Sequence, residues 1–126
     1  MNRRIKIFTS SAGDVYADLI DENPETADAI WGALPFEGEA NIWGDEIYFT
    51  IPVSSESENG REVVEIGELA YWPPGNAFFF FFGKTPASRG DEIRAASPVN
   101  VFARIVGDAT VFREVRRRER VVVEKA

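Results

Sequence analysis

The chain has 126 residues, a net charge of −7, and neither cysteine nor histidine. Its length is typical of a single domain spanning residues 1–126, and its acidity argues against nucleic-acid or membrane partners, because both need a positive protein surface. Without histidine and cysteine the chain cannot form a Ser-His-Asp triad, a thiol nucleophile or a zinc site of the usual type, so we expect no cofactor, no metal and a cytoplasmic location.

The charge is distributed unevenly along the chain. Residues 7–60 contain twelve acids and no lysine or arginine, whereas residues 113–120 contain five arginines. We interpret the arginine-rich segment as a solvated strand end or turn, because no aromatic residues alternate with the arginines as they do in many RNA-binding surfaces. An alternative is an assembly role, in which the acidic half of one copy docks on the basic strand of another to form a homo-oligomer.

The first elements predicted are a β-hairpin and a helix. Residues 4–9 and 15–20 read as strands around a turn that contains Gly13. Asn23 is a good N-cap, Pro24 suits the first helical position and Pro35 ends the helix. The helix has one apolar stripe, at i, i+3, i+4 and i+7, formed by Ala27, Ile30, Trp31 and Leu34.

The pattern after Ala40 is that of β-structure. Residues 40–53 alternate around a bend at Gly44–Asp45, and residues 62–72 give further strand with a turn at Gly67. In the first of these segments Ile47 and Phe49 share one face, so Glu46 and Tyr48 share the other.

A block of five phenylalanines, Phe78–Phe82, follows a rigid Pro-Pro-Gly turn. A strand without alternation needs apolar cover on both faces. We expect the core on one face and the helix on the other, and leave open whether the block also lines a pocket. Residues 83–97 read as a long loop, and the closing strands are expected at 99–107, 110–115 and 120–124.

Several motifs in this order resemble those of a small prokaryotic family with a cyclophilin-like fold and no established function. They are Asn-Pro-x-Thr-Ala (23–27), Trp-Gly-Asp-Glu-Ile-Tyr-Phe (43–49), Tyr-Trp-Pro-Pro-Gly (71–75), Phe-Phe-Gly with Thr-Pro (81–86) and Pro-Val-Asn (98–100). The resemblance covers nearly the whole chain. It implies an all-β fold, a closed eight-stranded β-barrel with the one short helix packed on it, and it implies no particular reaction.

True cyclophilins are prolyl isomerases that use an arginine beside a phenylalanine-lined groove. Here Arg104 lies in the segment Val-Phe-Ala-Arg-Ile-Val (101–106), and histidine is absent. A weak peptidyl-prolyl isomerase using Arg104 is therefore an alternative that rests on analogy of fold.

The leading hypothesis is a site that binds a small molecule or short peptide at one mouth of the barrel. Glu46 and Tyr48 form its acid and hydrogen-bonding pair, because they lie two apart on a strand and proton chemistry without histidine falls to such groups. Trp72 adds an aromatic wall, together with Trp43 and Tyr71. Two short polar residues near turns, Thr85 and Asn100, complete the candidates. The alternatives are a solvated Glu46, aromatic residues that only pack, and polar residues that only cap loops.

Overall fold

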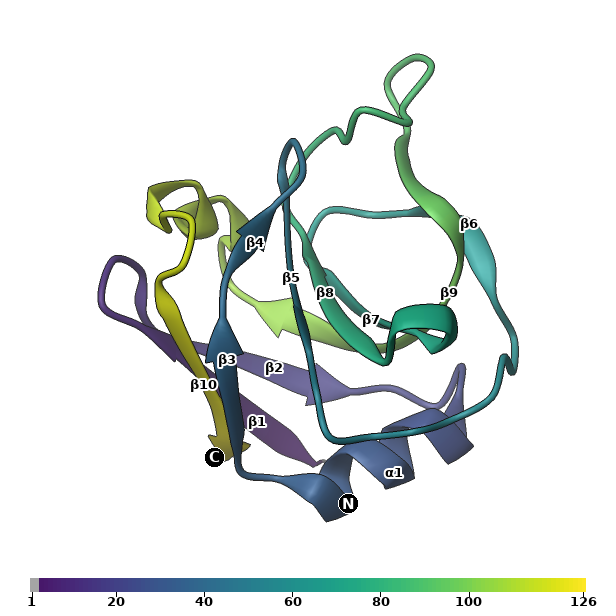
Figure 1. The fold of residues 1–126 in the computed structure, drawn as a ribbon, viewed down its shortest axis with the longest axis vertical. Coiled ribbons are helices and arrows are strands. Elements are labelled where there is room, and N and C mark those ends of the chain that lie inside the picture. The colour runs from purple at the N-terminus through teal and green to yellow at the C-terminus, as the bar shows by residue number, and fades with distance from the viewer. Residues whose placement is uncertain (1–2) are drawn as a thin grey trace.

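The computed structural model describes residues 3–126, which form ten strands, one α-helix and two 3-10 helices (Figure 1). Among these residues, no helix has the length and apolar character needed to cross a membrane. In chain order the elements are β1 (Arg4–Thr9), β2 (Gly13–Leu19), α1 (Pro24–Ala33), β3 (Phe36–Glu39), β4 (Asn41–Ile42), β5 (Glu46–Thr50), β6 (Arg61–Val64), β7 (Glu68–Trp72), η1 (Pro73–Gly75), β8 (Ala77–Phe81), β9 (Ile93–Val106), η2 (Ala109–Glu114) and β10 (Arg120–Lys125).

The strands form one antiparallel sheet that curls around the core (Figure 1). Its order is β3-β10-β1-β2-β9-β7-β8-β5-β4, and β6 pairs separately with β9. The edge strands β3 and β4 are consecutive along the chain, with only Ala40 between them. Within residues 3–126, no strand pairing joins these two edges, so hydrogen bonds do not close the sheet into a ring. One stretch of chain, residues 36–42, supplies both edge strands. The mainly β prediction is confirmed, whereas closure and the number of eight strands are not.

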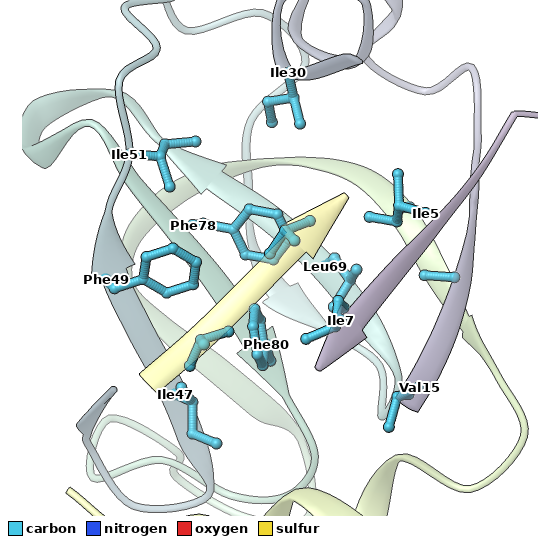
Figure 2. Close-up of a cluster of buried hydrophobic side chains, with 14 of the residues drawn as sticks. Ile5, Ile7, Val15, Ile30, Ile47, Phe49, Ile51, Leu69, Phe78 and Phe80 are labelled. Atoms are coloured by element: carbon cyan, nitrogen blue, oxygen red, sulfur yellow. The ribbon is translucent and has the colours of Figure 1, made fainter. Parts of the chain in front are cut away.

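The phenylalanines of β8 alternate between two hydrophobic clusters. Phe78 and Phe80 point into the main core, together with Phe49 and Ile47 of β5 (Figure 2). Phe79 and Phe81 point the other way, into a second cluster that contains Val64, Ala70, Ala77, Ile93, Ala95, Val99 and Val101. The prediction that the block is buried on both faces is thus confirmed.

The helix covers a different part of the core from the one predicted. Ile30 of α1 is fully buried in the main cluster, above Phe78 (Figure 2). Trp31 is only partly buried, and its ring lies between Arg3 and Lys125, whose charged groups are 5.6 and 4.7 Å from the ring centroid. The second face of β8 is covered by β6 and the first part of β9, so the expected helical cover on that face is wrong.

The start of α1 is held by a distant loop. Asn23 occupies the N-cap position without making a capping hydrogen bond. Its side chain instead donates to the carbonyl of Val101 and accepts from the backbone N–H of Asn59. The carboxylate of Glu58 accepts from the N–H groups of Glu25 and Thr26, so the orphan donors of the first turn are satisfied from outside the helix.

Two expected elements differ in the structure. The predicted loop 83–97 ends early, because β9 begins at Ile93, where its alternating residues pair with β6. The predicted strand 110–115 is a 3-10 helix instead. The Asp108 side chain accepts from the N–H of Thr110 and starts that helix, and Phe112 then packs 5.0 Å from the ring of Phe80.

The arginine-rich segment, residues 113–120, runs from the end of η2 through a turn to the first residue of β10, and its side chains are mostly exposed, as predicted. Two of its arginines form ion pairs with acids of the acidic half of the same chain. Arg113 lies 3.5 Å from Asp45, and Arg120 pairs with Glu37.

Candidate ligand-binding site

A cavity of about 310 Å³ lies over the face of β5 and β8 that points away from the main core. Its lining residues are Trp43, Glu46, Tyr48, Trp72, Phe79 and Ala96. The sequence led us to place the site at a barrel mouth, but residues of the cavity alternate with those of the core along the same strands. The cavity is therefore on the outer face of the sheet, beside the first part of β9.

Glu46 is the one carboxyl group that lines this cavity in the described part of the chain. Its side chain is almost completely buried, at 1% exposed, and its Oε2 has no hydrogen-bond partner among residues 3–126. Burial raises the pKa of Glu46 from 4.5 to about 8, because removal from water disfavours the charged carboxylate. Near neutral pH the side chain is largely protonated, and it can donate a hydrogen bond or give up its proton to a base.

A second buried carboxyl group, that of Glu68, has both hydrogen-bond and ion-pair partners. It is also 1% exposed, but its Oε2 lies 2.6 Å from a guanidinium nitrogen of Arg61. Its Oε1 accepts from the backbone N–H of Glu65 at 2.8 Å. Arg61 also pairs with Glu22, and these acids raise the pKa of its guanidinium. Within residues 3–126, no ion pair involves Glu46 and its Oε2 has no hydrogen-bond partner, which sets it apart from Glu68.

Aromatic rings form the walls of the cavity. The ring of Phe79 is in edge contact with Tyr48, 5.5 Å between centroids, and is stacked with Trp72 at 5.9 Å. The indole Nε1–H of Trp72 donates to the hydroxyl of Ser97 at 2.6 Å, which fixes the plane of that ring against β9. The walls are thus oriented by stacking and by a hydrogen bond in the free protein.

Two loops hold Glu46 and Trp43 in place. The N–H of Asp45 donates to the carbonyl of Lys84 at 2.8 Å, and the N–H of Phe82 donates to the carbonyl of Asp45 at 3.0 Å. Gly44 has a positive φ of 63°, which favours glycine, and a Cβ there would lie 2.9 Å from the Lys84 carbonyl oxygen. A side chain at position 44 would therefore force the loops apart.

The structure brings Glu46, Tyr48 and Trp72 together, as the sequence suggested. Thr85 lies in the adjoining loop, where its hydroxyl donates to the carbonyl of Arg94 and ties that loop to β9. Thr85 does not line the cavity and instead holds the adjoining loop in place.

Asn100 and Arg104 lie elsewhere. The Asn100 amide is fully buried and binds the hydroxyl of Thr26 and the carbonyl of Glu56, joining β9 to the helix and to the loop after β5. The Arg104 side chain is 58% exposed, and its Nε lies 3.4 Å from the Glu68 carboxylate. Neither residue lines the cavity.

Sequence reasoning missed Ala96, because its segment was expected to be a loop. Phe79 could not be separated from its four phenylalanine neighbours before the register was known. Tyr71 was grouped with the aromatic wall, but it is fully buried in the main core and donates its hydroxyl to the carbonyl of Val53. No group of three or more acidic side chains among residues 3–126 is arranged to hold a metal ion.

The fold and the sequence agree with known relatives. The sequence matches the family model described as Cyclophilin-like over residues 3–124, and the chain therefore belongs to that family. It is similar to the solution structure of a hypothetical protein from Archaeoglobus fulgidus, with a TM-score of 0.83 and 48% sequence identity over 99% of this chain and 95% of that one. A search of curated proteins finds no match. The chain is thus a mainly β protein with a cyclophilin-like fold.

Proposed function

We propose that this protein binds a small molecule, or one side chain of a short peptide, in the cavity over β5 and β8. The observation that carries the proposal is the burial of Glu46, a residue of the aromatic-walled cavity whose Oε2 has no hydrogen-bond partner among residues 3–126. A buried polar atom without a partner costs about 1–3 kcal/mol. A bound molecule that forms a hydrogen bond or ion pair with the carboxyl group would offset this cost.

The cavity has the composition of a small-molecule site. Such sites are mostly apolar, with a few polar groups that fix the orientation of the ligand. Its volume of about 310 Å³ is at the small end of the range for ligand pockets. We therefore favour a fragment-sized ligand or a single peptide side chain over an extended peptide.

Prolyl isomerisation receives less support from the geometry. The proposed cavity has a phenylalanine wall in Phe79, but the part of its lining that residues 3–126 supply holds a carboxyl group and no arginine. Arg104, on another part of β9, is paired with Glu68 of β7 and does not line the cavity.

The proposal predicts that fragments perturb the indoles of the cavity and leave the third tryptophan unchanged. The N–H signals of Trp43, Trp72 and Trp31 would be followed by NMR while benzyl alcohol, benzylamine and a short alanine–proline peptide are added. Trp31 serves as an internal control, because it lies beside Arg3 and Lys125, outside the cavity lining. We expect saturable shifts of Trp43 and Trp72 with at least one fragment, and about tenfold weaker binding in Tyr48→Ala, which loses one wall.

Equal shifts of all three indoles would indicate nonspecific association. That result, or the absence of a saturable shift with every fragment, would contradict the proposed function.

A further inference from the structure

We propose that the cavity selects an organic cation, such as a quaternary ammonium group, held by the aromatic rings and balanced by Glu46. This inference rests on the proposed function and names the class of ligand. It follows from the chemistry of the lining, which combines π-faces with a single acid.

The aromatic part of the lining suits a cation. Four of the six lining residues are aromatic, and two of these are tryptophans, the side chains that attract cations best. Phe79 lies between Tyr48 and Trp72, with contacts of 5.5 and 5.9 Å, so the three rings form a continuous wall. Rings gathered around a small cavity are the usual means of recognising alkylated ammonium groups.

The charge of the lining also favours a cationic ligand. Within residues 3–126, the lining includes the carboxyl group of Glu46 and no lysine or arginine. A bound cation would supply the charge that the buried carboxylate lacks, just as Arg61 does for Glu68. An anionic ligand would instead face an acid and four aromatic π-systems, whose faces are negative.

The surrounding charge would assist the approach of a cation. The net charge is −7, and residues 7–60, which include Trp43, Glu46 and Tyr48, contain no lysine or arginine. A field of one sign raises the local concentration of oppositely charged ligands and their association rate. Two basic residues on neighbouring elements are paired with acids, since Lys84 binds Asp91 and Arg94 binds Glu92 and Glu62.

The test compares two ligands that differ in charge and share a shape. Choline carries a quaternary nitrogen at every pH, and 3,3-dimethyl-1-butanol has carbon in its place. Binding would be measured by tryptophan fluorescence in a Trp31→Phe background, which leaves the two cavity tryptophans as reporters. At pH 9, above the Glu46 pKa of about 8, the carboxyl group is ionised. We expect choline to bind at least about tenfold more tightly than the neutral alcohol.

Variants locate the effect. Glu46→Gln should weaken choline binding about tenfold or more and leave the alcohol unchanged. Asp45→Asn is the matched control, because it removes the same charge from the adjacent residue, whose carboxylate lies beside Arg113 and outside the cavity lining. That control should change choline binding less than about twofold.

Each other outcome has a defined meaning. If the alcohol binds as well as choline, and Glu46→Gln changes neither, the cation inference is wrong while the proposed binding function stands. If Asp45→Asn weakens choline as much as Glu46→Gln does, general electrostatics and not the cavity explains the preference, and the inference is wrong. If neither probe nor any fragment binds, the proposed function and this inference both fail.

Discussion

Replacing Glu46 with glutamine is expected to stabilise the protein at alkaline pH by up to about 4–5 kcal/mol. The pKa of Glu46 is about 8 in the folded protein, against 4.5 for the free side chain. The difference between these two pKa values corresponds to about 4–5 kcal/mol of unfolding free energy, because one pKa unit is worth about 1.4 kcal/mol. The side chain is 1% exposed, so solvent screens the effect little.

The sign follows from where the proton is held. Between about pH 4.5 and pH 8 the folded state keeps the Glu46 proton and the unfolded state releases it. The unfolded state then binds fewer protons, so the wild-type protein loses stability as the pH rises through this window. Glutamine does not titrate, so the stability difference between variant and wild type should be near zero at pH 4.5 and reach its full size above pH 8.

Urea unfolding of both proteins across this pH range would measure the difference. Glu68→Gln is the control, because it makes the same chemical change at a buried acid that is paired with Arg61. That variant should destabilise the protein, since it breaks a buried ion pair. A stability difference for Glu46→Gln that does not change with pH, or a loss of stability at pH 9, would contradict the account.

Truncating Phe80 to alanine is expected to cost about 3–5 kcal/mol of unfolding free energy. Phe80 is 1% exposed in the main core, with the rings of Phe78 and Phe112 each 5.0 Å away. Because Phe78 lies on β8 and Phe112 on η2, the two rings cannot easily move together into the space that the Phe80 ring leaves. The cost should appear as a lower midpoint of denaturant unfolding with an unchanged slope.

Phe79→Ala is the matched comparison on the same strand. Phe79 lines the cavity, so its ring already lacks partners on one side and its removal should destabilise less. It should nevertheless weaken fragment binding, whereas Phe80→Ala should leave binding intact under conditions where the variant is folded. Equal stability losses, or weakened binding in Phe80→Ala alone, would show that the two faces of β8 have been assigned wrongly.

Most elements could be predicted from local pattern. Strand β1 and helix α1 follow from alternation and from an apolar stripe between two prolines, and both have the expected bounds. The failures occur where a distant partner decides the local conformation. Residues 110–115 have the composition of a strand, but Asp108 caps them as a 3-10 helix and Phe112 fills a place beside Phe80.

The closure of the sheet could not be predicted for a similar reason. Residues 36–39 show little apolar alternation, yet they form β3 because β10 is available to pair with them. After Ala40 the chain continues as β4, which pairs with β5. Only the complete set of pairings reveals that both edges of the sheet belong to one stretch of chain.

The candidate site shows the same division. Glu46 and Tyr48 could be paired from their spacing, and Trp72 from its aromatic character, because these signals are local. The spacing could not show which side of β5 holds the core. The lining residues that other strands contribute come from β7, β8 and β9, and one of them, Ala96, gave no signal in the sequence. Asn100 was a candidate because it is a polar residue near a turn. Its buried amide instead joins β9 to α1 and to the loop after β5.

The most direct test of the burial of the Glu46 carboxyl group is a carbon-13 NMR titration of that group, assigned by comparison with Glu46→Gln. The account predicts a titration midpoint near pH 8, well above the ordinary value of 4.5. A midpoint near 4.5 would show that the carboxylate is hydrated in the folded protein. The cavity would then hold no desolvated acid, and the central claim would be contradicted.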